Sequence, residues 1–182
     1  MNPLLDIRQF DQSLWLDFIS RPILIDGKLQ HRIKDEALRG VTSNPAIFAK
    51  SIGDTADYDS AIKALALQGK TTDEIYTSLA IADVQAATDL FRPLYDSADN
   101  SSDGYVSLEV SPELVNDTEG TIEEGLRLWK AVDRPNVMIS AGHARRPARH
   151  PSPHLGRRER ERDPHFRPGA LPPRDRSLPL GP

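Results

Sequence analysis

The sequence predicts an α/β fold with a parallel sheet; two observations support this prediction, and a third limits the residues to which it applies. Short apolar strands alternate with helical segments along residues 13–139, an order that favours parallel strands joined by helices. The predicted strands end in polar or charged residues, at the edge where parallel sheets bind ligands. The composition changes abruptly near residue 140, so the fold prediction applies only to the residues before it.

Charge separates the chain into an acidic body and a basic tail. Residues 141–182 contain ten arginines, no lysine, four acidic residues and nine of the fifteen prolines, for a formal charge of +6. The whole chain carries −4, which leaves −10 for residues 1–140. An acidic body argues against nucleic acid as its natural partner.

The absence of cysteine and the distribution of apolar residues indicate the cellular compartment in which the protein is expected. The chain has no cysteine, so disulfide and thiolate chemistry are excluded and a reducing compartment is favoured. The N-terminus lacks a basic region followed by an apolar stretch, and no run of eighteen apolar residues occurs. We therefore expect no membrane association and a cytoplasmic location.

The first half of the body predicts two strands separated by short helices. Residues 13–18 (SLWLDF) form the first expected strand, which ends beside Asp17. Residues 22–38 follow as two helices divided by Gly27, and Gly40 is expected to stop the second one. Residues 41–44 (VTSN) form the second strand, since the proline at position 45 favours an extended residue before it.

The next segment predicts three helices. Residues 45–50 and 56–67 form two of them, and Gly69 closes the second. Thr71 and Glu74 form a capping box that starts a long helix, which Pro93 is expected to disturb. The expected buried face of this helix consists of Ile75, Leu79, Ala82, Ala86 and Leu90.

The stretch from residue 103 to residue 112 (DGYVSLEVSP) is the central predicted strand. Its alternation places Tyr105, Ser107 and Glu109 on one face. An isolated carboxylate is more often solvated than catalytic. The same pattern recurs at Asp17 and at Thr42 with Asn44, however, which favours a pocket at the strand ends. Ser43 and Ser107 remain open between packing or backbone capping and a role in the site.

The last elements of the body are a helix over residues 118–132 and a strand over residues 136–139 (NVMI). The helix is expected to bury Ile122, Leu126 and Trp129. Arg134-Pro135 separates the two elements.

Four motifs resemble transaldolase: GVTSNPAIF at 40–48, DGYVSLEVSP at 103–112, DTEGTIEEGLRLW at 117–129 and RPNVMI at 134–139. The resemblance runs from about residue 2 to residue 139. It implies that residues 1–139 form the N-terminal half of a TIM-type (β/α)8 barrel, with about four parallel strands and their helices. Residues 140–182 are then expected to be a non-homologous, disordered, basic tail rich in proline and arginine.

The resemblance also implies an activity. Transaldolases transfer a dihydroxyacetone unit from sedoheptulose 7-phosphate or fructose 6-phosphate to an aldose phosphate in the pentose phosphate pathway. The reaction proceeds through a lysine Schiff base and needs no metal or organic cofactor, and sugar phosphates are the implied ligands. Asp17 matches the acid/base of the first strand, and Glu109 matches the third-strand glutamate that acts through a water. Thr42 and Asn44 match the residues that position the dihydroxyacetone unit.

The sequence departs from the family at Ser140, which stands where the imine-forming lysine is expected. A hydroxyl cannot form an imine, and the later strands of the family, the second half of the barrel, have no counterpart in the sequence. This chain is therefore predicted to be catalytically dead. The abrupt change at this point resembles translation in a shifted reading frame.

Two alternatives stay open. The first is a working transferase that uses another amine. The second is a non-catalytic interaction or nucleic-acid-binding protein that uses the basic tail. The arginines of the tail are interleaved with proline, histidine and acidic residues, and Phe166 is the one aromatic residue of the tail that could stack on a base. Nucleic acid is therefore the weaker expectation for a partner of the tail.

Overall fold

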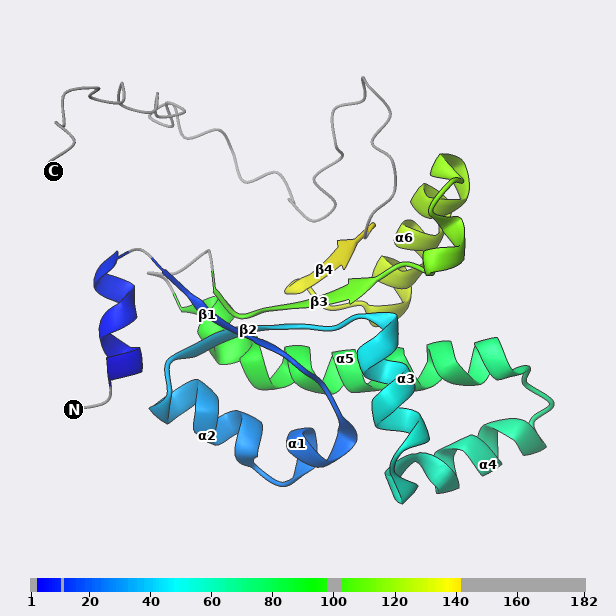
Figure 1. Ribbon diagram of the computed structural model, residues 1–182, viewed down its shortest axis with the longest axis horizontal. Helices are drawn as coiled ribbons and strands as arrows, with labels where there is room; N and C mark the ends of the chain where they lie inside the picture. Colours follow the sequence, from blue (N-terminus) through cyan, green and yellow to red (C-terminus); the bar gives the residue numbers. More distant parts are fainter. Residues whose placement is uncertain (1–2, 11, 98–102, 142–182) are drawn as a thin grey trace, which may run out of the picture.

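The computed structural model describes residues 3–10, 12–97 and 103–141. These residues form one sheet of four parallel strands that follow the chain order β1-β2-β3-β4 (Figure 1). This architecture confirms the expected α/β fold and the strand order of the N-terminal half of a (β/α)8 barrel. The strands are β1 (Leu14–Asp17), β2 (Leu38–Thr42), β3 (Tyr105–Glu109) and β4 (Val137–Ser140).

Helices connect successive strands. The predicted tail, apart from Ser140 and Ala141, lies outside the described residues. In the part of the chain that the structure describes, no helix is both long enough and apolar enough to cross a bilayer. The α-helices are α1 (Arg21–Ile25), α2 (Lys28–Asp35), α3 (Pro45–Gly53), α4 (Asp59–Leu67), α5 (Thr72–Asp96) and α6 (Thr118–Val132). The 3-10 helices are η1 (Pro3–Phe10), η2 (Ala56–Tyr58) and η3 (Pro112–Leu114).

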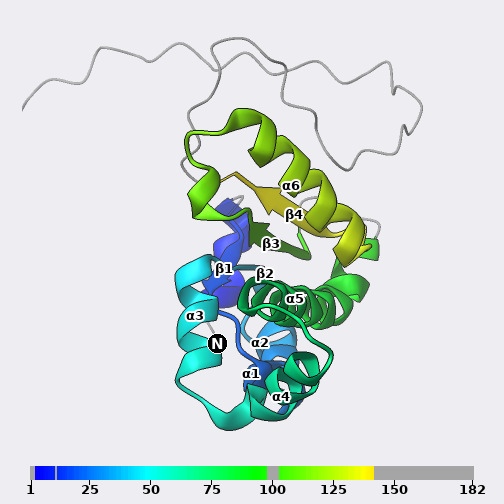
Figure 2. The same cartoon turned by 90° about the vertical axis from the view of Figure 1, so that its right-hand side faces the viewer.

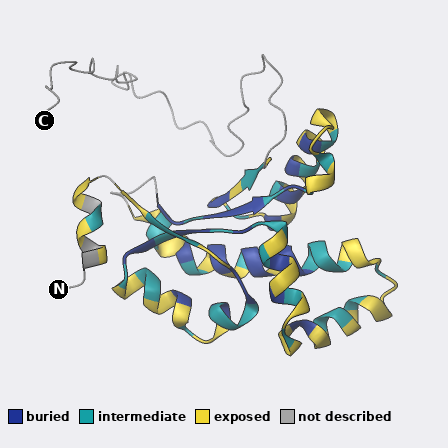
Figure 3. Ribbon diagram, in the orientation of Figure 1, coloured by how far each residue is buried: buried dark blue, intermediate teal, exposed yellow. Residues whose placement is uncertain are grey.

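The hydrophobic core lies between the sheet and the helices on one of its faces. A row of paired apolar residues, Leu16, Val41, Val106 and Val137, crosses all four strands. Helix α5 packs under β2 and β3, and α6 packs against β4 (Figures 1 and 2). The burial colours follow this arrangement, since the central strands and the sheet side of α5 are buried (Figure 3). Strand alternation therefore directs the neighbouring residues of each strand to the opposite, more open face.

Local sequence signals place the helix starts as predicted. The Asn44 side chain accepts a hydrogen bond from the Ile47 amide at 2.9 Å, so it caps α3, which begins at Pro45. Thr71 and Glu74 form the expected capping box of α5. The Asn44 cap fixes the start of α3 after β2, and the capping box fixes the start of α5 after the loop that follows α4.

Gly40 lies inside β2 and does not end the preceding helix, so that prediction is wrong. Helix α2 ends at Asp35, and β2 begins at Leu38. A Cβ atom at position 40 would lie 2.6 Å from the Trp15 ring. The glycine is needed because the indole of β1 packs directly on the backbone of β2.

Two helix faces differ from those expected. In α5, Ala82 and Ala86 are exposed, and the helix continues through the exposed Pro93. In α6, Ile122 is 50% exposed and Leu126 is 37% exposed. The residues that these helices bury are Leu79, Ala80, Asp83, Val84, Ala87, Thr88 and Phe91 in α5, and Thr121, Gly125, Leu128 and Val132 in α6.

Helix α6 buries Gly125 where it packs closely on β4 and on the residue that follows β3. A Cβ atom at Gly125 would lie 3.6 Å from Ile139 and 3.8 Å from Val110, which is ordinary van der Waals contact. Small residues allow this short approach between helix and sheet. Apolar periodicity does not detect such a face.

A polar network centred on the buried Asp83 joins α1, η2 and α5. Arg21 donates two hydrogen bonds to Asp83 Oδ1, at 3.2 and 3.0 Å, and the Tyr58 hydroxyl donates to Asp83 Oδ2 at 2.7 Å. The Tyr58 hydroxyl also accepts from the Arg21 amide at 2.8 Å, and the guanidinium lies 4.4 Å from the centroid of the Tyr58 ring. Each charge and hydroxyl in this network has a partner.

A second set of buried polar contacts holds the amino ends of the strands. Asp103 accepts from the Ser13 hydroxyl at 2.6 Å and lies 3.5 Å from the Arg39 guanidinium. The Asn136 amide nitrogen donates to the carbonyl oxygens of Thr88 and Gly104, at 2.9 and 2.8 Å. These contacts tie β1, β2, α5 and the loop before β4 together.

Candidate functional site

The carboxyl ends of the strands bring the predicted site residues to one edge of the sheet. Asp17, Thr42, Glu109 and Ser140 are the last residues of β1, β2, β3 and β4. Parallel strands expose their last side chains and the following loops at a common edge, where ligands bind in folds of this type. The location that the sequence predicted for these residues is therefore confirmed.

The register divides the four residues into two levels. Asp17 pairs with Thr42, one step beyond the Val41–Val106 pair. Glu109 pairs with Ser140, three steps beyond Val106. The two levels are thus two residues, or about 7 Å, apart, and strand alternation places both on the same face.

Asp17 and Thr42 contact each other directly on the lower level. The Thr42 hydroxyl donates a hydrogen bond of 2.7 Å to Asp17 Oδ1. Asp17 is exposed and Thr42 is half-buried. The threonine holds the carboxylate in place while solvent still reaches it.

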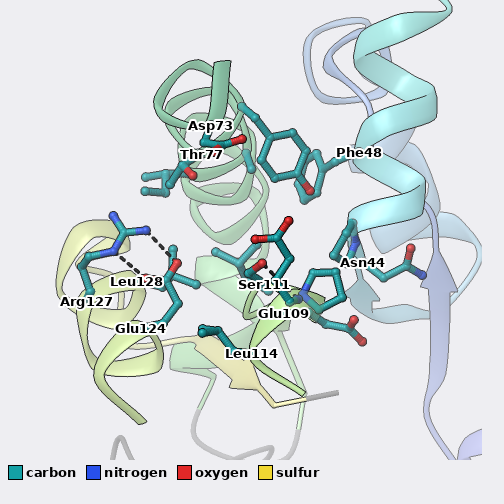
Figure 4. A pocket seen from close by; sticks show the side chains of 17 residues that line it. Asn44, Phe48, Asp73, Thr77, Glu109, Ser111, Leu114, Glu124, Arg127 and Leu128 are labelled. Atoms are coloured by element: carbon teal, nitrogen blue, oxygen red, sulfur yellow. Dashed lines mark hydrogen bonds and ion pairs between the residues drawn. The ribbon is translucent and has the colours of Figure 1, made fainter. Parts of the chain in front are cut away.

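Glu109 and Asn44 line a cleft at the upper level. The cleft has a volume of about 430 Å³ and lies between the end of β3, helices α3, α5 and α6, and the turn of η3. Glu109 lines the cleft from the end of β3, and Asn44 lines it from the start of α3 (Figure 4). Asp17, Thr42 and Ser140 do not line it, so the structure brings only part of the predicted site into this cavity.

The charges of the cleft are mostly negative. Four carboxylates line it, from Asp73, Glu109, Glu113 and Glu124, together with the guanidinium of Arg127. Arg127 donates two hydrogen bonds of 2.7 Å to Glu124 (Figure 4). This hydrogen bonding raises the pKa of the guanidinium. Among the described residues, the other three carboxylates form no ion pair, so carboxylates outnumber the one guanidinium of the cleft.

Two aromatic rings form the wall of the cleft beside Glu109. Phe48 and Tyr76 meet edge to face, with ring centroids 6.3 Å apart. Burial raises the pKa of Tyr76, and the nearby negative charge of Glu109 raises it further. The phenol therefore stays a neutral hydrogen-bond donor at physiological pH.

Ser43 has a structural contact. Its buried hydroxyl donates a hydrogen bond of 2.6 Å to the Ser107 carbonyl and so joins the ends of β2 and β3. This favours packing over a role in the site for Ser43. The Ser107 side chain is buried as well.

Sequence reasoning missed Tyr76, Arg127 and the carboxylates that share the cleft with Glu109. Asp73 and Tyr76 come from the first turns of α5, and Glu124 and Arg127 come from α6, far from any strand end in sequence. Glu113 lies in η3, shortly after the end of β3. Lys70 lines a smaller hollow that adjoins the cleft and shares Asp73 and Arg127 with it, and its amine donates to Ser78 Oγ at 3.1 Å. Across residues 3–10, 12–97 and 103–141, no cluster of three or more metal-ligating side chains occurs.

Comparison with known proteins agrees with this arrangement. The family model described as transaldolase/fructose-6-phosphate aldolase matches residues 14–140. The chain is 44% identical over 139 residues to "Transaldolase 2" of Nostoc sp., which covers 76% of this chain and 36% of that protein. It is 48% identical over 127 residues to the transaldolase of Saccharopolyspora erythraea, which covers 70% and 34%. The chain thus spans about a third of the length of these curated relatives.

Proposed function

The chain belongs to the transaldolase/fructose-6-phosphate aldolase family, and from this premise we propose that residues 14–140 carry the first half of a transaldolase site. The activity proposed for that site transfers a dihydroxyacetone unit between sugar phosphates, in the cytoplasmic pentose phosphate pathway and without a cofactor. One observation supports this proposal above the others. Residues that match the family's site end consecutive parallel strands, on two levels of one sheet face.

The two levels suit two separate proton transfers. Cleavage of a ketose next to a protonated imine requires a base for the hydroxyl proton, and we assign this role to Asp17, which Thr42 orients. Formation and hydrolysis of the imine require proton transfers to and from water, and we assign these to Glu109. Asn44 and Thr42 would hold the hydroxyls of the dihydroxyacetone unit.

We further propose that this chain is inactive, because Ser140 stands on the level of Glu109 where the reaction needs an amine. An imine is the electron sink for the carbanion that the cleavage leaves behind, and a serine hydroxyl cannot supply it. Lys70 is the amine to consider as a substitute, since its hollow adjoins the cleft.

Borohydride trapping with fructose 6-phosphate tests this proposal. The unaltered chain should give no reduced adduct, whereas Ser140→Lys should give one at position 140, identified by mass spectrometry of its peptides. Met138→Lys is the matched control, because residue 138 lies on β4 on the same face, two residues earlier and level with Ser107. It should give no adduct.

Two results would contradict the proposal. An adduct on any lysine of the unaltered chain would overturn the claim of inactivity and identify the amine in use. Equal labelling of Ser140→Lys and Met138→Lys would show that position 140 has no special relation to the site.

The alternative function is a non-catalytic interaction protein that uses its basic tail. The separation of charge between residues 1–140 and 141–182 favours it. Nucleic acid as the partner would show as binding that falls steeply with salt.

A further inference from the structure

We propose that two copies of this chain associate through the edges of their sheets, so that β4 of each copy pairs with β1 of the other. The two sheets then close into one barrel of eight parallel strands. The inference comes from the two outer strands and from the apolar side chains that surround them. It does not depend on the proposed transaldolase chemistry, because it requires only the backbone and the surface of the half barrel.

Each of the two outer strands has one neighbour. In the part of the chain that the structure describes, β1 pairs only with β2, and β4 pairs only with β3. The Val106 and Val110 amides donate to the carbonyl oxygens of Asn136 and Ser140, so these two residues of the last strand segment face β3. Because successive residues of a strand direct their backbone groups to alternate sides, the backbone of Ile139 faces away from β3.

Neither outer strand carries the residues that protect a sheet edge. Natural edges are often blocked by lysine or proline, which disfavour pairing with a strand of another chain. Strand β1 has the sequence LWLD and strand β4 has the sequence VMIS, so neither contains a lysine or a proline. Both outer strands are therefore suited to pairing with a further strand.

Exposed large apolar side chains occur around the same two strands. The described residues include nine of them, and eight lie within residues 4–25, around β1, or within residues 115–138, around α6 and β4. Phe18, which follows β1, is 42% exposed, and Met138 in β4 is 45% exposed. The exception is Leu67 in α4. Apolar side chains grouped on a surface indicate contact with another molecule.

A second copy of the chain fits both edges at once. A closed barrel of this class has eight strands, and β1 to β4 are half of that number. A two-fold axis along the barrel places β4 of each copy beside β1 of the other and keeps all eight strands parallel. A partner that paired with one edge alone would leave the other edge and its apolar side chains in solvent. Closure by a second copy leaves no edge.

Closure would also cover the open face of the sheet. This face carries Trp15, which packs on Gly40, and Met138, which is level with Ser107. In a closed barrel such side chains fill the interior. The carboxyl ends of both sheets then lie at the same end of the barrel. The second copy would therefore contribute its own strand-end side chains to one shared opening.

Sedimentation equilibrium of the full-length chain tests the association. We expect twice the chain mass of 20.2 kDa, without larger species, because a closed barrel has no edge for a third copy. Met138→Glu and Phe18→Lys each place a charge at both contacts of the dimer. Each should raise the dissociation constant at least about a hundredfold, since every dimer then buries two unpaired charges. Leu67→Glu is the matched control and should leave the dimer unchanged, because Leu67 lies outside both groups of apolar side chains.

A mixture of the two variants identifies which strands meet. In the proposed heterodimer, one contact carries both the glutamate and the lysine, and the other contact is unaltered. The mixture of Met138→Glu with Phe18→Lys should therefore dimerise with a dissociation constant at least about tenfold lower than that of either variant alone. This recovery, together with circular dichroism of each variant, separates a broken contact from a chain that has lost its fold.

Three results would overturn the proposal. The first is a monomeric mass for the unaltered chain at about 100 μM, a concentration at which a contact of micromolar affinity is largely occupied. The second is a Phe18→Lys chain that dimerises like the unaltered one while Met138→Glu does not, which would show that β4 meets β4. The third is a mixture that dimerises no better than its two components.

Discussion

Two of the four aspartates of helix α5, Asp73 and Asp83, lie ten residues apart, and their surroundings differ in kind. Asp83 is 3% exposed and accepts hydrogen bonds from Arg21 and Tyr58, so its charge is fully compensated. Asp73 is exposed and lines the acidic cleft, where it forms no ion pair among the described residues. The first arrangement stabilises the fold, whereas the second leaves charge available for a ligand.

The difference extends to the whole of each region. Around Asp83, one carboxylate, one guanidinium and one phenol satisfy one another. Around Asp73, the Arg127 guanidinium is paired with the carboxylate of Glu124. The carboxylates of Asp73, Glu109 and Glu113 form no ion pair among the described residues. The middle of α5, at Asp83, therefore carries a compensated charge, whereas its first turn, at Asp73, carries an uncompensated one.

The largest expected effect comes from breaking the buried network. Asp83→Ala leaves the half-buried Arg21 guanidinium and the buried Tyr58 hydroxyl without their acceptor, and we expect the free energy of unfolding to fall by about 3–5 kcal/mol. Asp73→Ala, on the same helix, should cost less than about 1 kcal/mol, because it removes only an exposed charge near the helix start. Urea unfolding followed by circular dichroism measures both. Similar losses in the two variants would erase the distinction.

A smaller loss is expected on the open face of the sheet. Gly40→Ala would place a Cβ 2.6 Å from the Trp15 ring, so the indole must move, at a cost of about 1–3 kcal/mol. Gly53→Ala is the matched control, because beyond the adjacent residues and the backbone of α3 itself no atom lies within 4 Å of the new methyl group. The control should be neutral or stabilise α3 by up to about 1 kcal/mol. If both variants behave alike in the same urea titration, the contact with Trp15 does not constrain β2.

Alkaline pH should weaken both regions. Burial raises the pKa of Tyr58, and its hydrogen bond to Asp83 raises it further, while burial and the charge of Glu109 raise the pKa of Tyr76. The folded protein holds these phenolic protons more tightly than the unfolded chain, whose tyrosine pKa is about 10. Their contribution is therefore complete below about pH 10 and is lost as the pH rises above it.

The slope of stability against pH measures this loss. Each tyrosine contributes at most about 1.4 kcal/mol per pH unit above pH 10. Tyr58→Phe and Tyr76→Phe should each make the decline between about pH 9 and pH 11 less steep. Glu109→Gln should reduce it by a smaller amount, since it removes only the second cause of the Tyr76 shift. An unchanged slope in all three variants would contradict the assigned causes.

The smallest effect is expected for an ion pair on the surface. Arg134 donates two hydrogen bonds to Asp89, at 2.6 and 3.0 Å, but both side chains are partly exposed to solvent. Arg134→Ala should cost about 0.5 kcal/mol at low salt and less at about 0.5 M salt. A loss comparable with that of Asp83→Ala would show that the exposure of an ion pair does not predict its contribution to stability in this protein.

The element order and the strand ends could be predicted from the sequence because their signals are local. Pro45 after Asn44, and Thr71 with Glu74, fix helix starts through a few adjacent residues. The carboxyl ends at Asp17, Thr42 and Glu109 follow from short apolar runs that stop at a polar residue.

The buried faces of α5 and α6 could not be predicted in the same way. Apolar periodicity favoured Ala82 and Ile122, which are exposed, and passed over Asp83, which is buried because distant residues compensate its charge. Gly125 is buried because α6 lies close to the sheet. The cleft needed the folded chain as well, since its walls come from α3, α5 and α6.

The contact between Trp15 and Gly40 has a practical consequence for observing this protein in solution. The chain has two tryptophans, and Trp129 packs against the helix-side core while Trp15 lies on the other face of the sheet. Their emission spectra therefore report on opposite sides of one sheet. With Trp129→Phe, the remaining indole becomes a fluorescent probe of whatever approaches the face that carries Asp17 and Thr42.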